Sequence, residues 1–206
     1  MKVWAWSGGV RNFGDELGPA VLERMGRDFE RVATIEEADL VTCGSLLEHA
    51  AENAKPGTVV WGSGLMYGAH TDLSHLDVRA VRGRLTAAAC GLSGVVTGDP
   101  GSLVPELWDR PRPVVDLGVV RHYVDDREYR WADADISAAA GVDQVIDFIG
   151  SCRRVASSSL HGLIVASAWG IPAVRLSHPW VAGGDFKWAD WLSGAGDPHR
   201  LVEVLP

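Results

Sequence analysis

Short apolar runs of the kind that form β-strands alternate along this chain with segments of helical periodicity. Runs such as KVWAW, ADLVTCGS and GTVVWGSG are apolar and lead into polar or glycine-bearing loops, whereas Leu17, Val21 and Met25 recur at helical spacing. Strands that alternate with helices in this way are typical of a parallel sheet. The sequence therefore predicts an α/β fold.

The pattern resumes after an interruption rich in proline. The segment PELWDRPRP, Pro105 to Pro113, has the composition of a linker or a chain crossing. Beyond it VVDLGVV, RRVASS and IPAVRL are predicted strands, and VDQVIDFIGSC and the stretch from Leu160 to Trp169 are predicted helices. We therefore expect two small Rossmann-like halves, residues 1–110 and 111–206, with the active cleft between them.

Charge narrows the classes of ligand. The chain of 206 residues has a formal net charge of −8 and no block rich in lysine or arginine. Nucleic acid requires a basic face, so we expect no nucleic-acid partner. A small anion remains possible, because the nearest charges and amide dipoles dominate inside a cleft.

Hydropathy and cysteine usage predict a cytoplasmic protein. The chain has no run of eighteen or more apolar residues and no start typical of a secretory signal, so no transmembrane segment is expected. Cys43, Cys90 and Cys152 are odd in number and form no C-x-x-C pair. We therefore predict buried thiols, with neither a disulfide framework nor a metal site.

Loops that follow the predicted strands are the candidate binding segments, because ligands of parallel sheets lie beyond the carboxyl ends of the strands. In SGGVRNFGDE, the glycines, among them Gly14, let the backbone approach a ligand, and Asn12 can form hydrogen bonds. Asp15 is either the N-cap of the following helix or a catalytic or substrate-binding group. The later loop GSGLMYG departs from the G-x-G-x-x-G spacing, so NAD binding is not predicted.

Arg82 occupies a second such position, in VRGRLT between a predicted strand and a predicted helix. A guanidinium there could hold a carboxylate or phosphate through two N–H groups, although most surface arginines are only solvated.

SSSLHG, Ser157 to Gly162, is the segment that indicates a binding site most specifically. Its serines can cap the predicted helix and leave backbone N–H groups to hold a phosphate. His161 lies in the first helical turn, where a bound dianion would favour its protonated form and make it a proton donor. The alternative is a histidine with a structural role. No G-x-S-x-G motif is present, so a serine hydrolase is not predicted.

Several segments together carry a family likeness. In chain order they are NFGDELGPAVL, GSLL, WGSG, VRGRLT, GDPGSLVP, HYVD, SSSLHGLIVASAWGIP and FKWADW. With them the chain resembles the polysaccharide pyruvyl transferase family, and especially its succinoglycan-type ketalase branch. The resemblance implies a fold like the two-domain glycosyltransferase type B, phosphoenolpyruvate as donor and a sugar diol as acceptor. Pyruvate would be moved onto two hydroxyls as a cyclic ketal and phosphate released, with no metal or other cofactor required.

The same resemblance implies the site residues. His161 is the expected acid, Asp15 the expected base for the sugar hydroxyl, and Arg82 the group that holds the donor's carboxylate or phosphate. The residues expected to bind substrate are Asn12, Gly14, Ser158, Ser159, Gly162 and Lys187.

The acceptor is expected to be a glycan precursor, lipid-linked or nucleotide-linked, on the cytosolic side. Trp180, Trp188 and Trp191 offer flat faces on which a sugar ring could stack, although core packing is the commoner role of tryptophan. Two alternatives stay open from the sequence. One is a glycosyltransferase that uses a nucleotide sugar, and the other is a ligand-binding member of the fold without catalytic activity.

Overall fold

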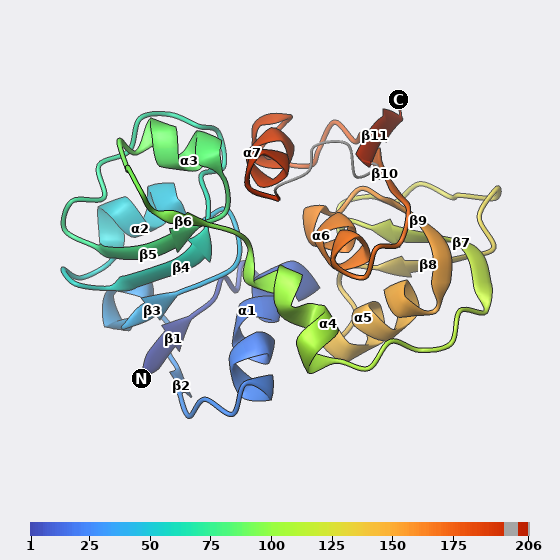
Figure 1. Ribbon diagram of the computed structural model, residues 1–206, viewed down its shortest axis with the longest axis horizontal. Coiled ribbons are helices and arrows are strands. Elements are labelled where there is room, and N and C mark those ends of the chain that lie inside the picture. The colour runs from blue at the N-terminus through green and yellow to red at the C-terminus, as the bar shows by residue number, and fades with distance from the viewer. Residues whose placement is uncertain (196–201, 206) are drawn as a thin grey trace. The chain divides into compact units, whose positions relative to one another are not determined.

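Figure 1 shows the computed structural model of the protein, which describes residues 1–195 and 202–205. The chain forms two compact units, each with its own sheet. Unit 1 is built from Met1–Trp6, Gly18–Pro100 and the segment that begins at Gly183. Unit 2 is built from Ser7–Leu17, Gly101–Ala182 and strand β11. Each unit is described by itself.

Unit 1 contains a six-stranded sheet in the order β2-β1-β3-β4-β5-β6, and all neighbouring strands in it are parallel. The strands are β1 (Lys2–Trp4), β2 (Glu30–Arg31), β3 (Leu40–Val41), β4 (Val59–Ser63), β5 (Asp77–Val81) and β6 (Val96–Thr97). The helices of this unit are α2 (Leu47–Asn53), α3 (Arg84–Ala89) and α7 (Phe186–Gly194), with a 3-10 turn, η1, at Ile35–Glu37.

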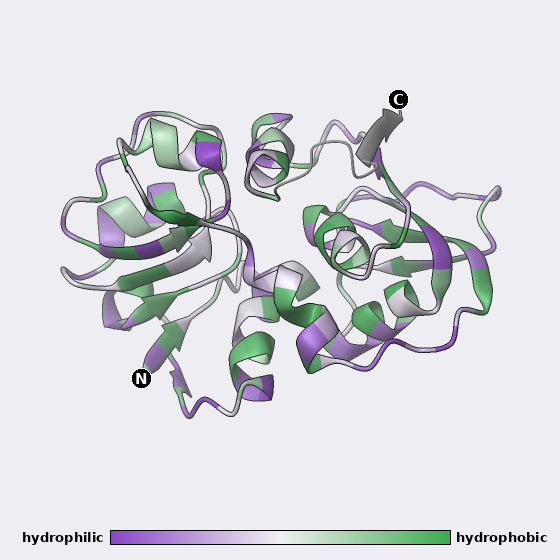
Figure 2. Ribbon diagram, in the orientation of Figure 1, coloured by the Kyte–Doolittle hydropathy of each residue, from purple (hydrophilic) through white to green (hydrophobic). Residues whose placement is uncertain are grey.

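The core of unit 1 lies between the sheet and helix α2. Val41 and Val60 from the strands, Leu47 and Ala50 from α2, and Leu65 are fully buried in one cluster. Figure 2 shows hydrophobic residues along β4 and its neighbours. β-branched residues suit such a sheet because their side chains pack well on a pleated surface.

Unit 2 contains a five-stranded parallel sheet in the order β11-β10-β9-β7-β8. The strands are β7 (Val115–Arg121), β8 (Ala134–Ser137), β9 (Cys152–Ser157), β10 (Ala173–Leu176) and β11 (Val202–Leu205). The helices are α4 (Val104–Leu107), which follows the 3-10 turn η2 (Pro100–Leu103), α5 (Val142–Gly150) and α6 (Leu160–Ala168).

Helix α6 is the central helix of unit 2. All residues from Leu160 to Ala166 are buried, and the helix contacts α5, β9 and β10. A helix that is apolar on every side requires cover on every side, which these neighbours supply. The first turn of α6 is therefore held firmly at the carboxyl end of β9.

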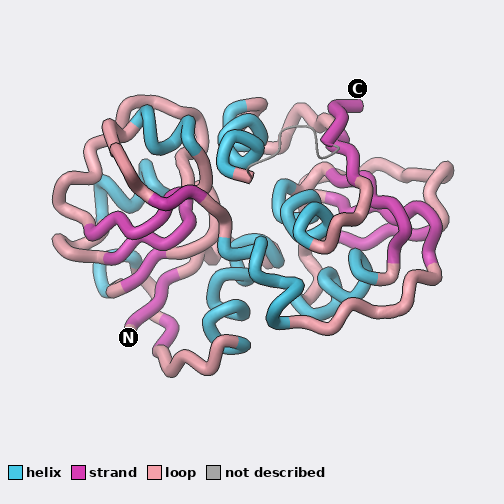
Figure 3. The backbone as a smooth tube through the Cα atoms, in the orientation of Figure 1, coloured by secondary structure: helices cyan, strands magenta, loops and turns pink. Residues whose placement is uncertain are grey.

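The connection from β7 to β8, residues 122–133, contains no helix (Figure 3). Parallel neighbours need a crossover of about a dozen residues or more, usually a helix. Here Tyr129 and Ala132 of the crossover pack directly against Val119, Ala156 and Leu176 of the sheet. An extended segment thus takes the place of a helix on part of this face.

The predicted α/β fold with two Rossmann-like halves is confirmed. Along the chain, the strands of the first sheet all precede residue 110 and those of the second all follow it. The compact units are not sequential, however, because helix α1 (Phe13–Arg24) is divided between them at Leu17 and α7 packs in unit 1. No helix among residues 1–195 and 202–205 has both the length and the apolarity to span a bilayer.

Candidate functional site

The SSSLHG segment lies at the carboxyl edge of the unit 2 sheet, where β9 ends and α6 begins. Ser157 Oγ shapes the turn. It accepts a hydrogen bond from the Ser159 N–H at 3.0 Å and lies 2.9 Å from the Val120 carbonyl and 2.8 Å from the Ser159 carbonyl. A Cβ on Gly162 would lie 2.4 Å from this oxygen, so glycine lets the helix start close to the turn.

Ser158 and Ser159 take different roles from those expected of helix caps. Ser158 Oγ donates to Asp125 Oδ2 at 2.5 Å and accepts from the His122 N–H at 2.9 Å. Ser159 occupies the N-cap position of α6, but its hydroxyl makes no capping hydrogen bond. The prediction that this hydroxyl caps the helix is wrong. That Ser158 and Ser159 bind phosphate stays a prediction.

His161 is the second residue of α6 and is nearly buried, with an exposed fraction of 8%. Its imidazole lies against the start of α1: a Cβ on Gly14 would come within 2.2 Å of His161 Nδ1. The Phe13 ring meets the imidazole edge to face, with 6.3 Å between centroids. Gly14 was predicted to allow a ligand close to the backbone, and the group that it admits in this structure is the imidazole of His161.

Asn12 and Asp15 interact with each other beside this contact. Helix α1 begins at Phe13, and Asn12 Oδ1 accepts the Gly14 N–H at 3.2 Å. Asn12 therefore caps the helix, and the alternative that Asp15 is its N-cap is wrong. Asn12 Nδ2 also donates to Asp15 Oδ2 at 2.9 Å, which orients this carboxylate in the first turn. Asn12, Gly14, Asp15 and His161 thus belong to unit 2.

Asp125 is a functional candidate that was not predicted from the sequence. Its carboxylate is buried and accepts from Arg127 Nε at 2.9 Å, Arg127 NH2 at 3.0 Å, the Tyr129 hydroxyl at 2.7 Å and the Ser158 hydroxyl. We call Asp125, Arg127, Tyr129 and Ser158 the Asp125 network. The one signal in the sequence was the position of Asp125 at the end of HYVD.

The Asp125 network is reflected in the acidities of its members. Burial raises the pKa of Asp125, but the hydrogen bonds from Arg127, Ser158 and Tyr129 outweigh it and hold the pKa well below its usual value. Burial, and then the bond to Asp125, raise the pKa of Tyr129. The network therefore holds a charged carboxylate and a neutral phenol at neutral pH.

Arg82 lies in unit 1, in a buried network of its own. Its exposed fraction is 1%, and Nε donates to Asp190 Oδ2 at 2.9 Å. NH1 donates to Ser45 Oγ and NH2 to the Leu65 carbonyl, each at 2.6 Å. Burial lowers the pKa of Arg82, and the charges of Asp190 and Asp99 oppose this. That the guanidinium also binds the donor stays a prediction.

Helix α7 approaches Arg82 because residue 83 is glycine. A Cβ on Gly83 would lie 1.8 Å from the Asp190 carbonyl oxygen, so no larger residue fits without moving the helix. Asp190 also accepts the Thr86 N–H and the Thr86 hydroxyl, each at 2.7 Å. Arg82 and Gly83 thus have a packing role in unit 1, alongside any role toward a ligand.

Lys187 and two of the three candidate tryptophans are buried in α7. Lys187 Nζ lies 5.7 Å from the centre of the Trp188 ring, and Trp188 and Trp191 are core residues. Trp180 is 78% exposed. Of the three expected stacking faces, only that of Trp180 is open to solvent, because α7 turns the other two inward.

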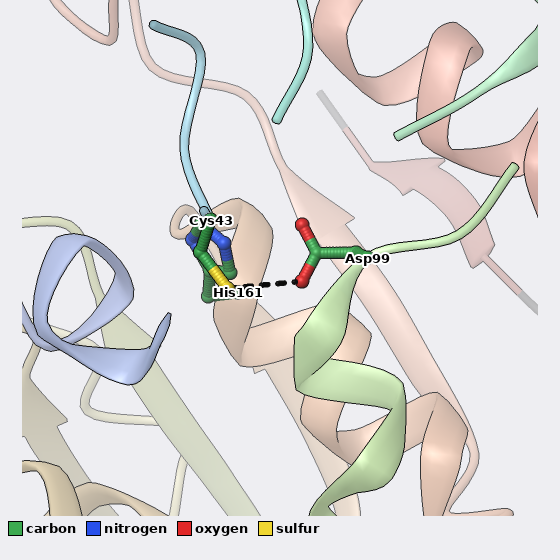
Figure 4. A group of neighbouring side chains, drawn as sticks. All are labelled: Cys43, Asp99 and His161. Carbon is green, nitrogen blue, oxygen red and sulfur yellow. Dashed lines mark hydrogen bonds between the residues drawn. The ribbon is translucent and has the colours of Figure 1, made fainter. Parts of the chain in front are cut away.

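The carboxyl edge of the unit 1 sheet holds Cys43 and Asp99. Figure 4 shows the Cys43 thiol donating to Asp99 Oδ1 at 3.6 Å. All three cysteines are free, with Cys43 and Cys152 buried and Cys90 partly buried. Burial raises the pKa of Cys90 and of Cys152 to about 11. These two thiols are therefore protonated and unreactive at neutral pH.

Comparison with known proteins gives one family. The profile of the polysaccharide pyruvyl transferase family matches residues 12–179. The chain is similar to the succinoglycan biosynthesis protein ExoV of Rhizobium meliloti (strain 1021), with 31% identity over 221 residues, 99% of this chain and 68% of that protein. It is also similar to the uncharacterized protein L143 of Acanthamoeba polyphaga mimivirus, with 30% identity over 165 residues, 71% of this chain and 58% of that protein.

A solved structure shares the fold. The crystal structure of the uncharacterized protein KP1_0663 from Klebsiella pneumoniae subsp. pneumoniae NTUH-K2044 covers 100% of this chain and 92% of its own, with a TM-score of 0.59. The two chains are 12% identical, so this likeness concerns the fold alone.

Proposed function

Because the chain belongs to the polysaccharide pyruvyl transferase family, we propose that it transfers pyruvate from phosphoenolpyruvate to two hydroxyls of a sugar, forming a cyclic ketal and releasing phosphate. The observation that carries the proposal is the placement of His161 in the first turn of α6, with Gly14 against its imidazole and the Asn12–Asp15 pair on the same helix start as Gly14. The acceptor is a glycan or glycan precursor, lipid-linked or nucleotide-linked.

The donor phosphate is proposed to bind at the start of α6. Backbone N–H groups at a helix N-terminus carry partial positive charge and suit a dianion. Ser159 at the N-cap makes no capping bond, and its hydroxyl is the proposed side-chain contact. In unit 1, Arg82 and Lys187 are proposed to bind the donor's carboxylate or phosphate.

Two side chains are proposed to move protons. His161 gives a proton to C3 of the enol, which becomes a methyl group while C2 becomes electrophilic. Asp15 takes the proton from the first sugar hydroxyl as that oxygen bonds to C2. The C2–O bond to phosphate then breaks, and the second hydroxyl closes the ring on C2. One of the two hydroxyl protons balances the methyl group and the other leaves with phosphate.

A ligand-stabilisation experiment separates this donor from that of the alternative transferase. Phosphoenolpyruvate and a series of nucleotide sugars are added separately to the purified chain, and its thermal unfolding is followed. A ligand at a hundred times its Kd adds about 2.7 kcal/mol to the free energy of unfolding. We expect stabilisation by phosphoenolpyruvate. Stabilisation by nucleotide sugars alone would instead identify a glycosyltransferase.

A phosphate-release assay then separates an enzyme from a binding protein. Phosphoenolpyruvate is offered with candidate sugar acceptors, and inorganic phosphate is measured over time. We expect release that depends on the acceptor. Binding of phosphoenolpyruvate without release, for every acceptor offered, would favour the non-catalytic alternative.

A further inference from the structure

Asp125 joins three loops at the carboxyl edge of the unit 2 sheet. Asp125 itself lies in the β7–β8 connection, Ser158 follows β9, and Ser177 and His178 follow β10. Ser158 Oγ donates to the carboxylate, and Arg127, which the carboxylate holds, donates through NH1 to the Ser177 carbonyl at 2.9 Å. His178 Nε2 lies 3.7 Å from Asp125 Oδ1.

The Asp125 carboxylate is the acceptor that the other side chains of the Asp125 network share. Its side chain is fully buried, and it receives hydrogen bonds from Arg127, Tyr129 and Ser158. A buried network with all donors paired favours a single arrangement, whereas removing one acceptor leaves several donors unmet. Ser158 therefore has one preferred position as long as Asp125 is present.

Ser158 lies in the turn that leads from β9 into α6. Its neighbour Ser157 bonds to the backbone of Ser159, which is the N-cap residue, and His161 follows two residues later. The hydroxyl of Ser158 also accepts the N–H of His122, so the connection that follows β7 bonds to this hydroxyl twice, through His122 and through Asp125. A shift of Ser158 would move the N-cap and the imidazole with it.

We infer that Asp125 is a positioning residue for pyruvyl transfer: it holds Ser158 by a hydrogen bond and thereby fixes the Ser157–Ser159 turn and His161 in the geometry used for the reaction. This inference rests on the proposed function, in which that turn and His161 act on the donor. Asp125 itself is not proposed to contact a reacting atom.

The direct test observes His161 without relying on activity. The protein is labelled with ¹⁵N-histidine, and the imidazole signals of His161 are assigned by their loss in His161→Gln. Asp125→Asn and Ser158→Ala are then compared with Asp116→Asn, which removes an exposed carboxylate paired with Arg154 at the other end of β7. We expect both network variants to shift the His161 signals in the same direction and the control to leave them in place. Unmoved His161 signals in folded Asp125→Asn and Ser158→Ala would overturn the inference.

Kinetics adds a second measurement. With a substrate pair that the parent protein turns over, Asp125→Asn and Ser158→Ala should each lower kcat about tenfold or more, measured well below their melting temperatures. The double variant should be no slower than the slower single variant, because both changes break one connection. Equal kcat in the parent and both variants, or fully additive losses, would contradict the positioning role.

Failure of the positioning role can be distinguished from failure of the proposed function. A parent protein that releases no phosphate with any acceptor contradicts the proposed function, while the His161 signals still test the positioning role. Should Asp125→Asn fail to fold, Ser158→Ala tests the same connection through a smaller change.

Discussion

Gly14 is the residue at which a missing side chain has the clearest consequence for the candidate site. Its hypothetical Cβ would lie 2.2 Å from His161 Nδ1, so Gly14→Ala must displace the imidazole. We expect phosphate release to fall at least tenfold, because a shift of about 1 Å in a reacting group can cost a hundredfold in rate.

Gly98→Ala is the matched control for this substitution, since a Cβ there meets no atom within 4 Å. Phosphate-release rates and melting curves of the two variants are compared with those of the parent. Normal activity in Gly14→Ala would show that the contact with His161 does not matter to the reaction.

Individual residues show what the sequence could and could not predict about the site. SSSLHG was identified from residue types and from its place between a strand and a helix, which are local features. The role of Asp125 depends on Ser158, 33 positions away, and on the parallel register that brings β7 beside β9. Spacing along the chain carries no signal for such a contact.

Among the secondary-structure elements, helix α7 buries a tryptophan that the sequence offered as a stacking face. Trp188 on this helix is 3% exposed, whereas Trp180, which precedes the helix, is 78% exposed. Trp188→Ala should lower the free energy of unfolding by about 3–5 kcal/mol, the usual cost of truncating a buried large aromatic side chain. Trp180→Ala should change it by less than about 0.5 kcal/mol and raise the acceptor KM. Denaturant unfolding and acceptor kinetics measure both, and equal stability losses would contradict this assignment.

The carboxyl ends of β7, β9 and β10 are joined through Asp125, and this makes stability depend on pH. Burial raises the pKa of Asp125, but hydrogen bonds from Arg127, Ser158 and Tyr129 lower it by more than burial raises it. The folded pKa therefore lies below the unfolded value of about 3.9. The charged carboxylate therefore contributes stability above about pH 4, and this contribution is lost as pH falls toward the folded pKa.

Urea unfolding of the parent and Asp125→Asn checks this sign. The difference in free energy of unfolding between the two proteins should be largest at neutral pH and shrink as the pH falls below about 4. A difference that is the same at neutral and at acid pH would mean that the Asp125 charge does not stabilise the fold.

The sequence predicted those strands and helices that have a clear local pattern, but not helices α2 and α7 or strands β2, β8 and β11. Helix α6 was expected at Leu160 to Trp169 and runs from Leu160 to Ala168. Helix α1 begins at Phe13, before Asp15, because Asn12 rather than Asp15 supplies the cap. The buried direction of Trp188 and Trp191 depends on packing of α7 in unit 1, which no local pattern reveals.

At the scale of the whole molecule, the chain passes between the two units more than once. The start of α1 belongs to unit 2, whereas α7, far along the chain, belongs to unit 1. A split of the chain at the predicted boundary, residue 110, would therefore separate Asn12, Gly14 and Asp15 from the unit 2 sheet that precedes His161. Activity assays should accordingly use the full chain.

The ketal product is the decisive evidence for pyruvyl transfer by this protein. The full chain is incubated with phosphoenolpyruvate and an acceptor that supports phosphate release, and the product is examined by NMR for a new methyl group on a ketal carbon. We expect one ketal per phosphate released by the parent, and a rate about 10²–10⁴-fold lower in folded His161→Gln because the acid is missing. Phosphate release without a ketal, or an undiminished rate in His161→Gln, would contradict the proposed function.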